Sequence, residues 1–212
     1  MSNAMPNAIV AARDVEVELG GRTILSGIGL TAAPGEVVAV VGDNGTGKST
    51  LLRCLAGLQP ARAGRIEVLD GPPADTTDFW QDVARTGDEP VWYPGLSTRE
   101  HLELMTAVHR EVRMTVDEAL AAFELTERAD LAPLSLSTGQ RQRLSLAMTL
   151  LRPSRLLLLD EPERGLDVTF RERLADILNG YTAEGGAIVM ATHDLRLPEA
   201  TGATVIRLEG ER

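Results

Sequence analysis

The ten residues VGDNGTGKST (41–50) decide how this chain is expected to fold. They contain the pattern G-x-x-x-x-G-K-[ST], with the apolar run EVVAVV (36–41) before it and KSTLLRCLAGL (48–58) after it. A continuously apolar run of this length is typical of a fully buried strand, and the leucines of the second segment recur at helical spacing. Residues 36–58 are therefore predicted to form a strand, a glycine-rich turn and a helix.

A turn of this pattern between a strand and a helix predicts a phosphate-binding loop. Its glycines let backbone N–H groups surround phosphate oxygens, and the positive end of the helix dipole adds to the attraction. We expect Ser49 to bind Mg²⁺ and Thr50 to contact a further phosphate oxygen. A glycine-rich turn without a ligand is the weaker alternative in this setting. The predicted phosphate-binding residues are Gly42, Asp43, Asn44, Gly45, Thr46, Gly47, Lys48, Ser49 and Thr50.

Lys48 is the only lysine of the chain, and all its other strongly basic residues are arginine. An ammonium is a compact charge on a thin stem that fits between the β and γ phosphates, whereas a planar guanidinium needs a wider, bidentate partner. Arginine is therefore expected to be too bulky for this loop.

Composition narrows the class of protein further. The 212 residues, 43% of them apolar, suffice for one large domain or two small ones. A net charge of −10 and an aromatic content of 3% argue against a nucleic-acid partner. The single cysteine, Cys54, excludes an internal disulfide and suits the reducing cytosol. No apolar run reaches the roughly 18 residues of a membrane span, so a cytoplasmic protein with at most a peripheral membrane role is expected.

The rest of the chain alternates strand and helix patterns. VEVEL (15–19) predicts a half-buried strand and RIEVLDG (65–71) an edge strand, whereas RLLLLDEP (155–162) and AIVMATHD (187–194) predict buried strands. This alternation predicts an α/β fold with a mostly parallel sheet and a ligand site at the carboxyl ends of the strands. Residues 1–4 are interpreted as an expression-tag remnant and 5–212 as one domain, with a helical subdomain at about 90–150.

Two acidic residues end the first of those buried strands. Asp160 is placed to reach a Mg²⁺ ion beyond the phosphate loop, and Glu161 to orient or deprotonate an attacking water. Two acids at the end of a strand are often only solvated. The phosphate loop makes the catalytic interpretation the favoured one.

The stretch LSTGQRQRLSLAMTLL (136–151) resembles the LSGGQ signature of ATP-binding cassette (ABC) ATPases, and Ser137 stands 23 residues before Asp160. LLLLDEP resembles the Walker-B motif of that family, RGLD (164–167) its D-loop and ATHD (191–194) its switch histidine. The resemblance covers residues 8–209. It implies a P-loop NTPase fold of the ABC type, with an N-terminal antiparallel β subdomain and an inserted helical subdomain.

The resemblance also implies roles and partners. Two such cassettes, identical or different, pair head to tail around two Mg·ATP and drive an integral-membrane permease. Lys48 and the loop amides would hold the phosphates, and Glu161 and His193 would act at the γ-phosphate, although an isolated histidine is more often structural. Ser49 and Asp160 would be ligands of Mg²⁺. The residues expected to act on the partner's ATP or at the D-loop are Ser137, Thr138, Gly139, Gln140 and Asp167.

Several positions depart from the family pattern. Leu19 stands where an aromatic residue usually stacks on adenine, so an apolar contact is expected to replace the stacking. Asp88 stands in place of the Q-loop glutamine; we favour its serving as a Mg²⁺ ligand over a loss of coupling to the partner. Thr138 replaces a signature glycine. Glu163 and Arg164 would pair across a dimer or, more simply, be solvated surface charges.

The resulting hypothesis is the ATPase subunit of an ABC transporter, with an exporter suggested by YPGLSTREHL (93–102). The helical insert and residues 86–102 would form the groove for the membrane partner. A non-transport ABC ATPase and a cassette that senses ATP without hydrolysing it are the alternatives.

Overall fold

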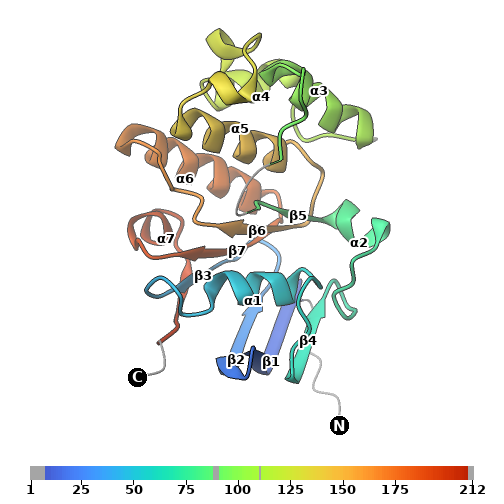
Figure 1. Cartoon of the computed structure of the whole chain (residues 1–212), viewed down its shortest axis with the longest axis vertical. Coiled ribbons are helices and arrows are strands. Elements are labelled where there is room, and N and C mark those ends of the chain that lie inside the picture. Colours follow the sequence, from blue (N-terminus) through green and yellow to red (C-terminus); the bar gives the residue numbers. More distant parts are fainter. Residues whose placement is uncertain (1–7, 88–90, 110, 210–212) are drawn as a thin grey trace.

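The computed structural model describes residues 8–87, 91–109 and 111–209. It contains two sheets with helices around them (Figure 1). The smaller sheet is antiparallel and has the order β2-β1-β4, with bounds Val10–Leu19 for β1, Arg22–Ala32 for β2 and Ala63–Val68 for β4. Gly20 and Gly21 join β1 to β2 at φ values of 58° and 79°, as a two-residue hairpin turn requires.

The larger sheet is parallel throughout and has the order β5-β6-β7-β3-β8. Every residue of β3 and β7 is buried, which confirms the fully buried strands predicted from the apolar runs. The α/β fold with a parallel core sheet and an antiparallel N-terminal sheet is thereby confirmed. The strand bounds are Val83–Arg85 for β5, Leu156–Asp160 for β6, Ala187–Thr192 for β7, Val37–Val41 for β3 and Thr204–Arg207 for β8.

Two hydrophobic cores lie on opposite faces of the parallel sheet. Val38 and Val40 of β3 belong to the core shared with the antiparallel sheet and α1 (Lys48–Leu55), which lies between the two sheets (Figure 1). Val37, Ala39 and Val41 belong to the core on the other face, under the remaining helices. This division follows from the alternation of side chains along a strand.

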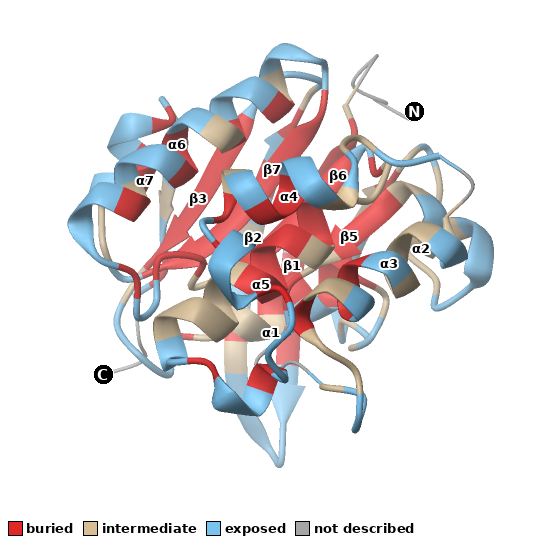
Figure 2. Cartoon of the chain, turned by 90° about the horizontal axis from the view of Figure 1, so that it is seen from above, coloured by how far each residue is buried: buried red, intermediate tan, exposed pale blue. Residues whose placement is uncertain are grey.

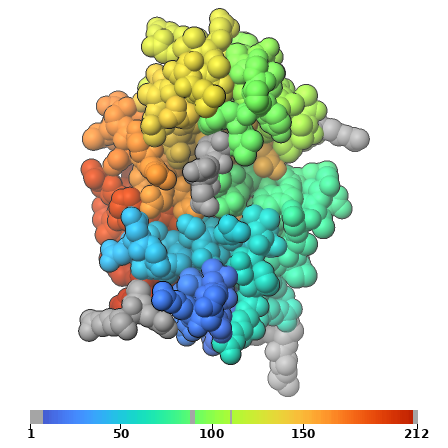
Figure 3. All heavy atoms as spheres, in the orientation of Figure 1, coloured from blue at the N-terminus to red at the C-terminus, as the bar shows by residue number. Residues whose placement is uncertain are grey.

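The helices on that other face include α5 (Thr138–Leu150), α6 (Val168–Ala183) and α7 (Arg196–Ala200). Above them lie α3 (Thr98–Val108), α4 (Val116–Ala122) and two 3₁₀ turns, Thr126–Arg128 and Pro133–Ser135 (Figures 1 and 2). Figure 3 shows these green to yellow residues at one end of the molecule and the blue antiparallel sheet at the other.

Hydroxyl side chains begin these helices. Ser97, Thr115 and Ser137 each cap a helix and form a reciprocal capping box with the glutamate or glutamine three residues later. Thr76 likewise caps α2 (Thr77–Asp82). No helix among the described residues is long and apolar enough to cross a membrane.

Candidate active site

The phosphate loop runs from the end of β3 to the start of α1, and the packing requires two of its glycines, Gly42 and Gly47. A Cβ at Gly42 would lie 2.5 Å from the carbonyl oxygen of Leu208, and a Cβ at Gly47 would lie 2.7 Å from the Leu25 side chain. Gly47 also has a φ of 93° as the N-cap of α1, a conformation that L-residues with a side chain rarely adopt. The loop therefore curls tightly, which suits its predicted role of surrounding phosphates with backbone N–H groups.

Lys48 is folded back into this loop. Its Nζ donates hydrogen bonds to the carbonyl oxygens of Gly42, at 2.7 Å, and Asp43, at 2.8 Å, and the residue is only 6% exposed. The side chain thus occupies a narrow space enclosed by main chain. This geometry fits the expectation that a slender ammonium suits the loop better than a guanidinium.

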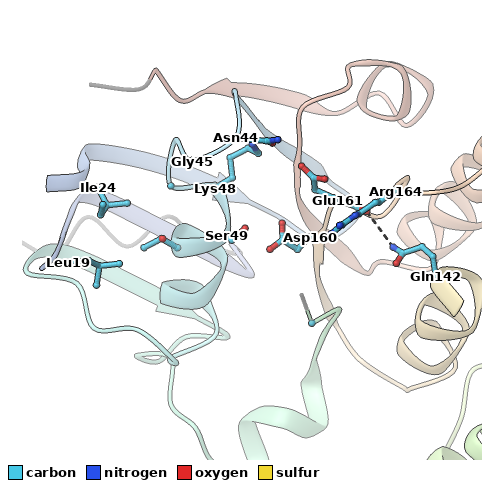
Figure 4. Close-up of a pocket in the computed structure, with 13 residues that line it drawn as sticks. Leu19, Ile24, Asn44, Gly45, Lys48, Ser49, Gln142, Asp160, Glu161 and Arg164 are labelled. Atoms are coloured by element: carbon cyan, nitrogen blue, oxygen red, sulfur yellow. Dashed lines mark hydrogen bonds between the residues drawn. The ribbon is translucent and has the colours of Figure 1, made fainter. Parts of the chain in front are cut away.

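A cleft of about 580 Å³ opens beside the loop (Figure 4). It brings together residues from the hairpin, the loop, the end of β6 and the helix α5. Sequence reasoning missed Ile24, Gly87, Gln142 and the cleft position of Arg164. The lining residues are Leu19, Ile24, Asn44, Gly45, Gly47, Lys48, Ser49, Thr50, Gly87, Gln142, Asp160, Glu161 and Arg164.

Asp160 and Glu161 occupy the carboxyl end of β6, as predicted. The backbone N–H of Asp160 donates to the Thr86 hydroxyl at 2.9 Å, and that of Glu161 donates to the Ala191 carbonyl at 2.8 Å. Glu161 has a φ of 43°, a strained value for a non-glycine residue that surrounding contacts must maintain. Gln142 provides one such contact, because its Nε2 donates to the Pro162 carbonyl at 3.2 Å and to that of Glu161 at 3.4 Å.

The structure brings His193 directly to Glu161, although 32 residues separate them. Nδ1 of His193 lies 3.0 Å from Oε1 of Glu161. The histidine side chain is 55% exposed and the Glu161 side chain 24%. Because a carboxylate only accepts hydrogen bonds, this contact places the Nδ1 proton toward Glu161 and leaves Nε2 free to face another group.

Glu163 corrects one expectation. It was expected to pair across a dimer or to be a solvated surface charge, but it is 3% exposed and its Oε1 accepts a hydrogen bond from the Thr192 hydroxyl. Burial raises the pKa of the Glu163 carboxyl above its usual range, and the hydrogen bond from Thr192 opposes that rise. Its neighbour Arg164 is exposed, as expected, and lines the cleft.

The LSTGQ segment begins α5 and lies outside the cleft of its own chain. The Ser137 hydroxyl accepts from the Gln140 N–H at 3.2 Å, and the Ser137 N–H donates to Oε1 of Gln140 at 3.0 Å. Ser137 and Thr138 are exposed. A Cβ at Gly139 would lie 2.5 Å from the Gly165 carbonyl oxygen, so this segment packs directly on the RGLD turn.

Asp167 begins α6 and is held by a partner that sequence reasoning missed. Its Oδ1 accepts from the Phe170 N–H at 2.9 Å, and its Oδ2 accepts from Arg143 at 2.6 Å. The Phe170 N–H and then the positive charge of Arg143 lower the pKa of Asp167 below its usual range. Arg143 also stacks over the Phe170 ring at 3.9 Å, so one arginine links α5 to the start of α6.

The sequence model of the ABC transporter family matches residues 25–164. The chain belongs to the ABC transporter family. It is the ATP-binding subunit or domain of such a transporter, and it is an ATPase that converts ATP and water to ADP and phosphate.

Individual relatives agree with the family assignment. The chain is 38% identical, over 91% of its length and 85% of the relative's, to the cytochrome c biogenesis ATP-binding export protein CcmA of Rhodobacter capsulatus. It is 40% identical, over 89% of its length and 62% of the relative's, to the aliphatic sulfonates import ATP-binding protein SsuB of Cupriavidus pinatubonensis. A solved ATP-binding subunit of an ABC transporter superposes with a TM-score of 0.82 at 27% identity, covering 94% of this chain and 85% of that one.

The chemistry of the cleft fits a magnesium ion in this ABC protein. The carboxylate of Asp160 and the hydroxyl of Ser49 line the same cleft as the phosphate loop (Figure 4). Mg²⁺ prefers oxygen ligands and is usually held by one or two protein groups together with phosphate oxygens and waters. Among the described residues no three His, Cys, Asp or Glu side chains are grouped as a metal site. An ion that takes most of its ligands from phosphate and water does not need such a group. Asp88, the third predicted ligand, lies outside the described residues.

Leu19 and Ile24 are apolar lining residues on the hairpin side of the cleft (Figure 4), and Leu19 is 41% exposed. Replacing this leucine with an aromatic residue would supply a flat face for a base. We expect Leu19→Tyr to tighten ATP binding about fivefold, because stacking on a base adds about 1 kcal/mol. Calorimetric titration of the purified chain with ATP checks this.

The control for that substitution is Leu58→Tyr. Leu58 is 37% exposed, close to the exposure of Leu19, but it does not line the cleft. Its replacement should leave the ATP affinity unchanged. Equal affinities of wild type and Leu19→Tyr would show that the base lies elsewhere.

Proposed function

We propose that this ABC ATPase dimerises head to tail around two Mg·ATP and drives a membrane-spanning partner that exports its substrate. The observation that carries the dimer is the separation of two halves of a site within one chain. The phosphate loop, Asp160 and Glu161 line the cleft, whereas Ser137 and Thr138 are exposed and do not line it. The N-terminus of a 13-residue helix therefore faces solvent where it can receive the phosphates bound by another chain.

Each residue of the cleft has a defined task in this proposal. Lys48 leaves the carbonyls of Gly42 and Asp43 for phosphate oxygens, and the loop amides hold the rest of the triphosphate. Ser49 and Asp160 hold Mg²⁺, which would neutralise charge on the phosphates. Glu161 orients the attacking water and accepts its proton, while His193 contacts the γ-phosphate.

The signature segment and the RGLD turn complete the partner's site. Ser137, Thr138, Gly139 and Gln140 form the start of α5, where the N–H groups of Thr138 and Gly139 are the ones outside the capping box, and Asp167 fixes the start of α6 beside them. A glutamine at position 140 closes the capping box, so the segment is shaped before any ATP arrives.

Mixing two inactive variants tests the two-chain site. Lys48→Arg damages the phosphate loop, and Ser137→Arg blocks the exposed helix N-terminus, so neither homodimer should hydrolyse ATP. A mixed dimer carries both lesions in one site and none in the other. An equimolar mixture is expected to recover between about a quarter and a half of wild-type phosphate release. Each mixed dimer has one intact site, and mixed dimers make up half of all dimers under random pairing or all of them where the damaged homodimers do not form.

The matched control is Ser135→Arg, a change at an exposed serine just before the signature. It should leave hydrolysis intact in the homodimer. A mixture of the two damaged variants that stays inactive would contradict the head-to-tail arrangement.

The membrane partner is proposed to dock at the helical end of the molecule, within the subdomain expected at about 90–150. Between α2, α3 and α5 lie two cavities of about 520 and 230 Å³ that share Met105 and Arg152. The neighbouring side chains of Val91, Tyr93 and Val108 are exposed apolar surface. Such a surface on an otherwise acidic chain suits a helical segment of the permease, which would place the subunit at the cytoplasmic face of the membrane.

An export direction rests on the segment YPGLSTREHL (93–102) and on relatives named as export proteins. The similar importer protein SsuB shows that the family allows both directions. The proposed dimer consists either of two copies of this chain or of this chain and a different cassette. The mixing experiment tests the pairing of two copies directly.

A further inference from the structure

A buried carboxyl group next to the catalytic pair has no part in the proposed chemistry. Glu163 is three residues after Asp160, is 3% exposed and directs Oε1 to the Thr192 hydroxyl. No hydrogen-bond donor of the described residues reaches its other oxygen, Oε2, which is buried. Burying a carboxyl group with one oxygen unsatisfied is costly, so the chain keeps it there against a free-energy penalty.

Thr192, the partner of Glu163, is the last residue of β7 and is fully buried. Its carbonyl oxygen accepts from the Gly42 N–H at 3.4 Å, and its hydroxyl oxygen accepts from the Asp194 N–H at 3.0 Å. The hydroxyl has one proton, for which the acceptors are Oε1 of Glu163 and, at 3.2 Å, the carbonyl oxygen of Asp194; the contact with Glu163 is the shorter one. Thr192 therefore joins Glu163 to the residue on the far side of His193.

His193 lies between the two residues joined in this way. Its side chain is more than half exposed, so packing alone does not fix the imidazole beside Glu161. The position of the ring depends on the backbone of the turn from Thr192 to Asp194. Asp194 forms ion pairs with Arg171, at 3.2 Å, and with Arg196, at 3.0 Å. Thr192 forms a buried hydrogen bond with Glu163.

We propose that Glu163 is a positioning residue that acts through Thr192 to hold His193 against Glu161. The hydrogen bond fixes the start of the turn, and the backbone then directs Nδ1 of His193 to Oε1 of Glu161. The consequence for turnover rests on the proposed roles of Glu161 and His193. The effect of Glu163 on the position of His193 does not depend on these roles, and it can be tested without nucleotide.

The first test reads the imidazole directly. The chain has only three histidines, so nitrogen NMR of ¹⁵N-histidine-labelled full-length protein resolves His193, assigned by its loss in His193→Ala. In the wild type the proton should reside on Nδ1, because that atom faces Glu161. Glu163→Met should move the tautomer ratio of His193 toward that of a freely solvated histidine side chain, whereas Glu163→Gln, which can still accept from Thr192, should preserve it.

Two further variants keep this test decisive. Thr192→Val removes the hydroxyl, and with it both the contact to Glu163 and the contact to the Asp194 N–H, so it should disturb His193 at least as much as Glu163→Met; this covers the case in which the latter does not fold. Glu172→Met replaces an exposed glutamate on α6 and should change nothing at His193. An unchanged His193 spectrum in folded Glu163→Met or Thr192→Val protein would overturn the proposal.

The second test measures steady-state ATP hydrolysis. Glu163→Met is expected to lower kcat about tenfold with an unchanged KM for ATP, since a displaced group at the γ-phosphate affects the reaction more than binding. In a His193→Ala background the same substitution should have no further effect. A loss of kcat that persists in that background would overturn the proposed path, while a His193→Ala protein with wild-type kcat would instead refute the role of His193 and leave the NMR result standing.

Discussion

Lys48→Arg is expected to reduce ATP hydrolysis at least about 100-fold and to abolish ATP-driven dimerisation, although it keeps the charge. The Nζ of Lys48 donates to the carbonyl oxygens of Gly42 and Asp43, at 2.7 and 2.8 Å, and the residue is almost fully buried. A guanidinium is wider and needs several partners in its plane, so it would displace the loop that binds the phosphates. Phosphate release and size-exclusion chromatography with ATP measure the two effects.

The control for Lys48→Arg is the reverse exchange on the same helix. Arg53→Lys keeps the charge of an exposed residue of α1 and should alter neither property. Wild-type hydrolysis and dimerisation in Lys48→Arg would show that the loop tolerates a planar cation, and the explanation given for the only lysine would then be wrong.

Glu161→Gln is expected to lower kcat about 1000-fold while ATP still binds, because the amide cannot take a proton from the attacking water. The phosphate loop and the Mg²⁺ ligands are untouched, so an ATP-bound dimer should accumulate. Light scattering or size-exclusion chromatography with Mg·ATP detects the dimer, and phosphate release measures kcat. Lys48→Arg should fail to form this dimer, which separates loss of binding from loss of the catalytic base.

Glu172→Gln is the matched control for Glu161→Gln, since it makes the same exchange at an exposed position. It should hydrolyse ATP at the wild-type rate and form no stable ATP-bound dimer. Substantial turnover by Glu161→Gln would assign the activation of water to another group.

Features that depend on neighbours in the chain could be predicted from the sequence. The strand, the glycine turn and the helix of residues 36–58 follow from apolar runs and glycine spacing, and the structure has β3, the loop and α1 there. The strand predicted at 15–19 is part of a longer one, β1, which also includes Val10, Ala11 and Ala12. Those three consecutive residues are all buried, so they show no alternation of apolar and polar side chains. Register shifts after Ala12 and a φ of 49° at Asp14 also interrupt the period-two pattern between them and residues 15–19.

Features that depend on distant contacts could not be predicted. EPERG (161–165) has the composition of a surface turn, yet Glu163 is buried because β7 ends beside it and offers the Thr192 hydroxyl. Arg143 contacts Asp167 across 24 residues of sequence, and Gln142 reaches the Pro162 carbonyl across 20. Their polar side chains fit an ordinary exposed helix face just as well, so only the tertiary structure reveals these contacts.

The contact of Gly139 with Gly165 has a mechanical consequence. A side chain between two segments can change rotamer and absorb a displacement, but here the backbones touch without one, and a Cβ at Gly139 would lie 2.5 Å from the opposing carbonyl oxygen. The start of α5 and the RGLD turn are therefore expected to move together as one rigid unit. In the proposed dimer, a motion that brings the signature onto the partner's nucleotide would therefore also move the RGLD turn, whose Arg164 N–H donates to the Glu161 carbonyl at 3.0 Å.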